Sequence, residues 1–65
     1  MKIDKAIRLA MVQGKGIKRD SEPCDIWFLP SNSLACIIIM DSDKPLSQKW
    51  NPKADDLMAT DWKTY

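Results

Sequence analysis

The stretch DIWFLPSNSLACIIIM, residues 25–40, decides the fold. Its first part, DIWFLP (25–30), combines aromatic and branched side chains, which is typical of a β-strand. The polar SNS (31–33) predicts a hairpin loop, and LACIIIM (34–40) predicts the strand that returns beside the first. The middle of the chain should therefore form an antiparallel pair of strands.

The second of these strands should be apolar on both faces, because neighbouring side chains of a strand alternate between the two faces of its sheet. One amphipathic helix can cover one face, and the other face then needs a second cover. A chain of 65 residues has little left to supply that cover, and so short a domain has a marginal core by itself. We therefore predict a homo-oligomer, a tetramer rather than a dimer.

The residues before the hairpin predict a helix and a short strand. Gly14 is expected to end the helix, GIKR (16–19) to form the strand, and DSEP (20–23) to form a turn. The helix is expected over residues 3–13, because apolar residues recur there at helical spacing, at Ile3, Ala6, Ile7, Ala10 and Met11.

The residues after the hairpin predict a turn, a strand, a short helix and a last strand. DSDK (41–44) has turn chemistry, and PLSQKW (45–50) alternates as a half-polar strand with its proline at the strand start or at a sheet edge. WKTY (62–65) is expected to form the last strand. Together these elements predict an α+β fold in a single domain, residues 1–65: a small antiparallel β-sheet with an N-terminal amphipathic helix and a short C-terminal helix before the last strand.

The short helix has its own signals within residues 51–61. Asn51 is expected as the N-cap and Pro52 as the first helical residue. The two aspartates that follow, at 55 and 56, then fall near the positive end of the helix dipole, where acids are favourable. Two apolar residues are expected to pack inward and two polar residues to end the helix: Leu57 with Met58, and Thr60 with Asp61.

Composition excludes several classes of protein. The net charge of +1 argues against a partner that is a nucleic-acid polymer. The chain has no histidine, and Cys24 and Cys36 are too far apart for a Cys-x-x-Cys pair, so no metal site and no cofactor are expected, and both thiols should be reduced. No apolar run approaches the roughly 20 residues of a membrane helix, and no segment resembles a signal peptide. We expect a cytoplasmic protein.

The residues that catalysis needs are also missing. No histidine is present to act as a general acid or base, and Asp55 and Asp56 would point roughly 100° apart on a helix, where they cannot converge. DSD (41–43) lacks the glycine and the glutamate of a calcium loop, and GKGIKRD (14–20) lacks the spacing of a P-loop. We therefore predict that the chain is not an enzyme.

Binding is better supported, because six of the ten basic residues lie within residues 1–19 and eight of the nine acids follow them. At the end of a predicted strand, Lys18 and Arg19 can hold a phosphate or simply be solvated. The tryptophans can stack on a flat base or close a core. A nucleotide-like ligand fits this combination. Its sugar or base groups can be hydrogen-bonded by three residues whose presence capping and turn bonding also explain: Asn51, Thr60 and Asp61. The stacking candidates are Trp27, Trp50 and Trp62.

Three motifs carry a resemblance to a known family. GKGIKR (14–19) after a short amphipathic helix, then WF (27–28), then KWNPKADDLMATDW (49–62), resembles the Thoeris anti-defense two family of phage proteins. The closing pattern of that family, Trp-x-Pro-x-x-x-Asp-Leu-x-Ala-x-Asp-Trp, falls on Trp50, Pro52, Asp56, Leu57, Ala59, Asp61 and Trp62. The resemblance covers essentially the whole chain and adds Asp56 to the candidate ligand-binding residues.

The resemblance implies a sponge that acts in the cytoplasm of an infected bacterium. Such proteins capture cyclic signalling nucleotides of bacterial immune systems such as Thoeris and CBASS, without cleaving them. The ligands are cyclic ADP-ribose variants, cyclic dinucleotides or cyclic trinucleotides, and the resemblance implies pockets between the subunits of a homo-oligomer. Members often carry a tryptophan before a proline after the Ile-x-Arg strand, where this chain has Glu22. This departure affects which nucleotide is bound and whether any nucleotide is bound.

Two other functions fit the same sequence. One is an inhibitor that binds a host enzyme through an exposed sheet edge or face. The other is a structural accessory protein of a phage. A sponge predicts tight binding of a small nucleotide by the purified protein, whereas an inhibitor predicts a stable complex with a host protein.

Overall fold

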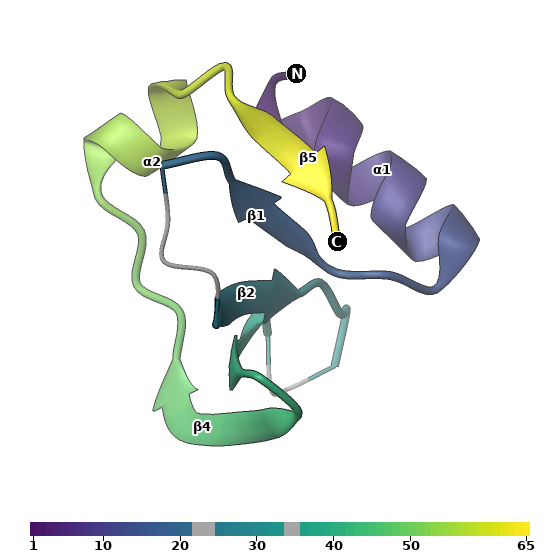
Figure 1. The fold of residues 1–65 in the computed structure, drawn as a ribbon, viewed down its shortest axis with the longest axis vertical. Coiled ribbons are helices and arrows are strands. Elements are labelled where there is room, and N and C mark those ends of the chain that lie inside the picture. Colours follow the sequence, from purple (N-terminus) through teal and green to yellow (C-terminus); the bar gives the residue numbers. More distant parts are fainter. Residues whose placement is uncertain (22–24, 34–35) are drawn as a thin grey trace.

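The computed structural model describes residues 1–21, 25–33 and 36–65 (Figure 1). Cys24, Glu22, Leu34 and Ala35 lie outside the described residues. In chain order the elements are α1 (Ile3–Gln13), β1 (Ile17–Arg19), β2 (Ile26–Leu29), β3 (Ile38–Asp41), β4 (Lys44–Lys49), α2 (Ala54–Met58) and β5 (Trp62–Thr64).

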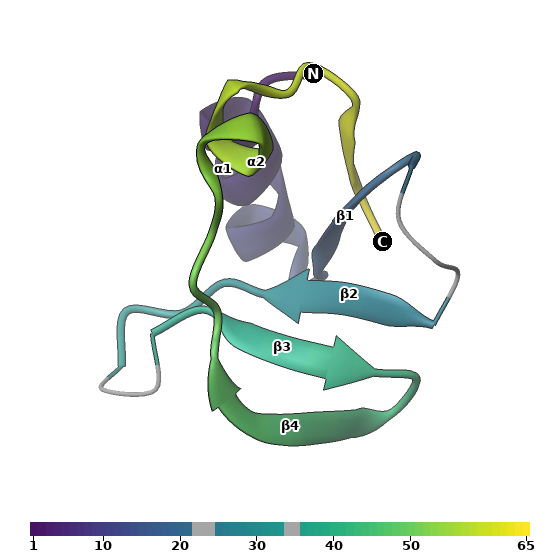
Figure 2. The same ribbon diagram turned by 90° about the vertical axis from the view of Figure 1, so that its left-hand side faces the viewer.

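The five strands form one sheet in the order β4-β3-β2-β1-β5. Every neighbouring pair is antiparallel, and the last strand closes on the outer side of the first. Figure 2 shows β2, β3 and β4 one above another, with β1 and β5 turned away from them, as the twist of a sheet requires. The predicted α+β fold is confirmed, with its N-terminal helix and its short helix before the last strand.

Helix α1 packs against β5 and β1 (Figure 1). It ends as expected at Gly14, whose left-handed φ of 68° suits glycine and whose N–H donates to the carbonyl of Ala10. Ala6 and Ala10 are completely buried, and their small side chains let the helix approach the sheet closely. Met11 was predicted on the apolar face but is exposed, whereas its neighbour Ala10 is buried.

The sheet has two faces that are covered differently. Paired residues of neighbouring strands point to the same side, so Ile17, Phe28 and Ile39 share one face, which also carries Trp62. We call this the helix face, because α1 covers it. Its core is built around the aromatic triad, defined as Phe28, Trp50 and Trp62. The ring centroids lie 4.5 Å apart for Phe28 and Trp50, 5.8 Å for Trp50 and Trp62, and 5.9 Å for Phe28 and Trp62.

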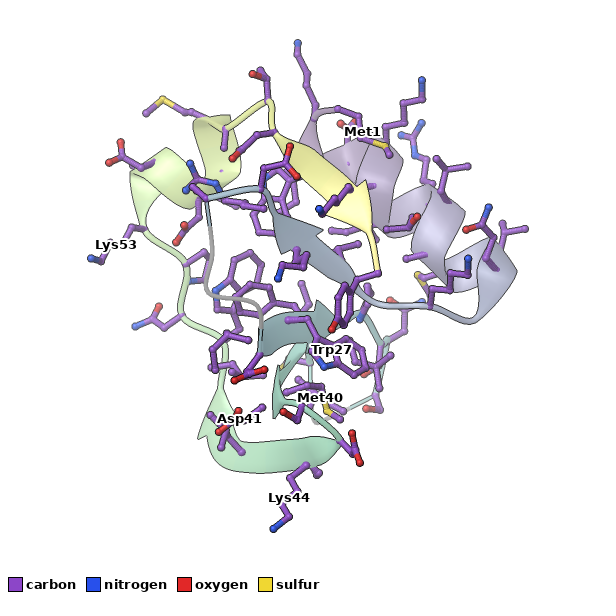
Figure 3. The ribbon with its side chains drawn as sticks, viewed as in Figure 1. Met1, Trp27, Met40, Asp41, Lys44 and Lys53 are labelled. Atoms are coloured by element: carbon purple, nitrogen blue, oxygen red, sulfur yellow. The ribbon has the colours of Figure 1, made fainter. Side chains whose placement is uncertain are left out.

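The opposite face carries Lys18, Trp27, Met40 and Tyr65, and we call it the Trp27 face. Trp27 pairs with Met40 across β2 and β3, and Figure 3 shows the two side chains close together near the β3–β4 turn. The indole also lies on the backbone of Gly16: a Cβ added there would sit 2.1 Å from Trp27 Cε3 and 2.8 Å from the Phe28 carbonyl oxygen. Only glycine fits this position, so packing fixes the first residue of GIKR (16–19).

Several strand boundaries differ from the prediction. The returning strand begins at Ile38 and not at 34, because Cys36 adopts a φ of 60°, which no extended strand allows. The turn after it is tight: Asp41 pairs directly with Lys44, so β4 begins at Lys44. Cys36 is exposed.

The predicted start of the short helix is wrong. Helix α2 begins at Ala54, with Lys53 in place of Asn51 as its N-cap residue, and Pro52 lies before the helix. The reason is the Asp56 carboxylate, which accepts the backbone N–H of Lys53 at 2.9 Å and so satisfies a donor at that point.

The other end and the inner side of this helix also differ from the prediction. It stops at Met58, because Ala59 is extended, so Thr60 and Asp61 follow it as part of the approach to β5. Leu57 and Met58 do not pack inward: they are 55% and 69% exposed. A helix of one and a half turns beside the end of the sheet presents no buried residue to the core.

Candidate functional site

The candidate site centres on an ion-pair cluster at the end of β1, which we call the Arg19 cluster: Arg19, Asp56 and Asp61. Arg19 Nε donates to Asp61 Oδ1 at 3.0 Å, and Arg19 Nη1 donates to Asp56 Oδ1 at 3.2 Å. The three side chains are between 19% and 32% exposed, so the cluster is partly screened from water and still open to a ligand. One residue of β1, one of α2 and one before β5 meet here.

Backbone contacts hold both carboxylates in place. Asp56 is fixed at the start of α2 by the Lys53 N–H, and its own carbonyl accepts Trp62 Nε1–H at 2.8 Å. The carbonyl of Asp61 accepts the N–H of Asp20 at 3.2 Å, next to the pairing of Arg19 with Trp62 across β1 and β5. The buried tryptophan of the core therefore also positions the cluster.

The electrostatics of the cluster favour its charged forms. The hydrogen bond from Arg19 holds the pKa of Asp61 below its ordinary value of 3.8, and the attraction between the two charges acts in the same direction. The hydrogen bond to Asp61 likewise raises the pKa of Arg19. At neutral pH the cluster therefore combines one guanidinium with two carboxylates, and its formal charge is −1.

The second basic candidate lies elsewhere. Lys18 precedes Arg19 on β1 and therefore projects from the opposite face of the sheet. It is only 5% exposed, and its ammonium nitrogen lies 5.1 Å from the centroid of the Tyr65 ring. This is the geometry of a cation–π contact. The structure does not bring Lys18 and Arg19 together.

The tryptophan candidates are also divided between the two faces. Trp50 belongs to the aromatic triad on the helix face and is half-buried. Trp27 lies on the Trp27 face, where its ring centroid is 5.6 Å from that of Tyr65 and its Nε1–H donates to the Ser42 carbonyl at 2.7 Å. The ring that stacks on a ligand base can therefore be Trp50 on the helix face or Trp27 on the Trp27 face, but one face does not offer both.

The remaining candidates flank α2. Asn51 lies before the helix and Thr60 after it, and both are exposed. The carbonyl of Thr60 accepts the amino group of Met1 at 2.9 Å, which ties this segment to the start of the chain beside β5. Thr60 is the residue directly before Asp61, and Asn51 lies five residues before Asp56 in the chain.

Tyr65 was not among the candidate residues that the sequence indicated. It contacts both Trp27 and Lys18 and so joins the two candidates of the Trp27 face. A signal for it was present, because alternation in a last strand that begins at Trp62 directs residue 65 to the face opposite Trp62.

Other kinds of site have little support. The described residues contain no group of three or more His, Cys, Asp or Glu side chains that could hold a metal ion. Within the same residues, neither helix is long and apolar enough to cross a membrane. A hollow at the β3–β4 turn is lined by Asp41, Ser42, Asp43 and Lys44, all exposed, and lies at the hairpin tip where Figure 3 labels Asp41 and Lys44. We do not take it as the site, because it contains none of the candidate residues.

Comparison with known proteins identifies a family. A family model described as the Thoeris anti-defense 2-like domain matches residues 1–65, the whole chain. Neither the search of curated proteins nor that of solved structures found a match.

Proposed function

Because the chain belongs to the Thoeris anti-defense 2-like family, we propose that it is a sponge that sequesters a cyclic immune-signalling nucleotide without cleaving it. The family places the protein among those that counter Thoeris defence and points to a non-catalytic role. The proposed ligand is a cyclic ADP-ribose variant or a cyclic di- or trinucleotide, and the proposed place of action is the cytoplasm of the infected bacterium.

The observation that carries this proposal is the division of the candidate residues into two groups. The first group consists of the Arg19 cluster, Arg19, Asp56 and Asp61, together with the candidates that precede or follow α2 in the chain, Trp50, Asn51 and Thr60. The second group, on the Trp27 face, consists of Lys18 and Trp27 with Tyr65 beside them. The first supplies hydrogen-bonding groups, and the second supplies an aromatic ring beside a cation, which suits a base and its phosphate.

One subunit holds these two groups on opposite faces of its sheet, so a small ligand inside one subunit reaches one group only. A homo-oligomer removes this restriction, because the Arg19 cluster of one subunit can face the Trp27 side of its neighbour. We therefore propose a pocket between subunits of a tetramer. Light scattering of the purified protein should give a mass well above that of one 7.4 kDa chain, and a monomer at micromolar concentration would contradict this pocket.

Capture and release tests the sponge directly. Purified protein is incubated with cyclic ADP-ribose or with a cyclic dinucleotide, freed of unbound ligand and heated, and the released material is identified by mass spectrometry. Intact nucleotide at a stoichiometric yield is the expected result. A degraded product would instead indicate an enzyme, and no capture of any cyclic nucleotide would contradict the sponge.

A second candidate function, a protein-binding inhibitor of a host enzyme, is favoured by one observation. Leu57 and Met58 are consecutive residues of α2, and both side chains are largely exposed. Exposed large apolar side chains are a usual property of a contact surface. Co-purification with a single host protein, together with no nucleotide capture, would favour this function. If the protein neither captures a nucleotide nor co-purifies with a host protein, the structural accessory role remains.

A further inference from the structure

Resting on the proposed function, we propose that Arg19 is a positioning residue. It holds Asp56 and Asp61 as acceptors for hydroxyl or amino groups of the nucleotide, such as the ribose hydroxyls, and does not itself bind the phosphates. This reverses the expectation from the sequence, in which Lys18 and Arg19 formed a phosphate site.

Two carboxylates already occupy the guanidinium of Arg19. The Nε and Nη1 atoms of Arg19 are directed at carboxylates from two segments, at 3.0 and 3.2 Å. These carboxylates are themselves anchored through the Lys53 N–H and through the Asp20–Asp61 backbone bond. A phosphate that bound the same edge of the guanidinium would have to displace a fixed partner.

The charge of the cluster also disfavours an anion. Lys63 on β5 pairs in register with Lys18 and so projects from the other face, where it forms an ion pair with Asp20 at 2.9 Å. The cluster itself has one basic and two acidic groups, which sum to −1. An anion placed here would lie beside carboxylates with no excess of positive charge, and like charges at close range oppose binding. Lys18 cannot compensate, because it projects from the other face.

The carboxylates of the cluster can accept further hydrogen bonds. An ionised carboxylate only accepts hydrogen bonds and has about four lone-pair sites. The two Asp56 oxygens accept one described bond each, from Arg19 and from Lys53. Two fixed, partly exposed carboxylates therefore match the paired donors of a ribose or an exocyclic amine, and the guanidinium holds them in place.

The experiment compares ligands that differ by one hydroxyl. Calorimetric titrations use cyclic ADP-ribose and 3′,3′-cyclic diadenylate, each beside its 2′-deoxy analogue, at low and high NaCl. The proteins are wild type, Asp61→Asn, Arg19→Ala and Arg19→Lys. Lys63→Ala is the control, since it removes the same charge two residues from Asp61 without touching the cluster. Melting curves check folding of each variant.

We expect the wild type to prefer the ribose form by about ten- to a hundred-fold, the usual effect of one hydrogen bond to a charged group. Asp61→Asn and Arg19→Ala should both lose most of this preference, Arg19→Lys should keep part of it, and Lys63→Ala should keep all of it. A phosphate-binding Arg19 predicts something different: ribose and deoxyribose forms weakened equally by Arg19→Ala, with a loss that shrinks as salt screens the charges.

The outcomes separate the two proposals. If the wild type binds a probe but shows no ribose preference, or if Arg19→Ala retains the preference, the positioning role is wrong and the sponge stands. If the wild type binds neither probe, the positioning role falls together with the sponge for these ligand classes.

Discussion

The two faces of the sheet solve the same packing problem in different ways. The helix face is covered by a separate element, α1, and encloses the aromatic triad. The Trp27 face has no covering helix among the described residues, and its own large side chains cover it: the indole lies over Gly16, with Tyr65 and Met40 beside it. A chain of 65 residues therefore gains one conventional core and one thin aromatic layer. Stability should depend mostly on the first, and the second is available for binding.

The strongest test of this comparison is Trp62→Ala on the helix face. Trp62 is 1% exposed and also donates to the Asp56 carbonyl, so its truncation should cost about 3–5 kcal/mol. Small domains have little more than this to lose, and circular dichroism should show a largely unfolded protein at 37 °C. Trp27→Ala is the matched variant on the other face and should cost clearly less. Equal losses would mean that the two faces contribute alike.

Gly16→Ala tests the packing of the Trp27 face. The new Cβ would meet the Trp27 ring and the Phe28 carbonyl, so the indole must move at a cost of about 1–3 kcal/mol. We expect a lower urea midpoint and a shifted tryptophan emission spectrum. Gly14→Ala is the control, because nothing lies within 4 Å of its Cβ and its cost comes from the left-handed φ alone. A Gly16→Ala protein with unchanged emission would show that the indole does not lie on this glycine.

A smaller effect is expected from the acid side of the Arg19 cluster. The pKa of Asp61 is lowered in the folded protein by its hydrogen bond with Arg19, so its stabilising contribution is present above the ordinary value of 3.8 and is lost as the pH falls through the folded value. The melting temperature of the wild type should therefore decline in that acidic range. Asp61→Asn should decline less steeply there, and parallel curves for the two proteins would contradict the pairing.

The smallest effect should come from α2. Leu57→Ser replaces a largely exposed side chain, and surface changes of this kind stay within about 0.5 kcal/mol. Denaturant midpoints should thus coincide for wild type and Leu57→Ser. A clear loss of stability that appears only at concentrations where the protein is oligomeric would assign Leu57 to a subunit contact.

Local patterns predicted the elements well. The spacing of Ile3, Ala6, Ile7 and Ala10 predicted α1, and Gly14 its end, because both signals act within a few residues. The start of α2 was not predictable in the same way: Asn51 and Pro52 are good helix-start residues, but Asp56 satisfied the Lys53 N–H instead. The exposure of Leu57 and Met58 depends on where α2 sits beside the sheet, which no local pattern contains.

The sequence indicated candidate residues for a site, but it did not indicate how they are arranged in space. Adjacent basic residues on a strand were expected to act together, yet strand alternation alone places Lys18 and Arg19 on opposite faces. The partners of Arg19 come from positions 37 and 42 residues away in the sequence. Contacts at that distance arise from the closure of β5 on β1, which propensity and spacing do not reveal.

We also expect the pairing of β5 with β1 to limit the rate of folding. Its three residue pairs join positions 43 to 47 residues apart, so the chain must pay the entropy of closing a long loop before Trp62 reaches the core. The hairpins formed by β2, β3 and β4 can form earlier from local contacts, but they leave the aromatic triad without Trp62. Contacts of such high order slow folding in small domains. We therefore expect refolding to be limited by arrival of the last strand, and any nascent chain that lacks residues 62–64 to remain without a closed core.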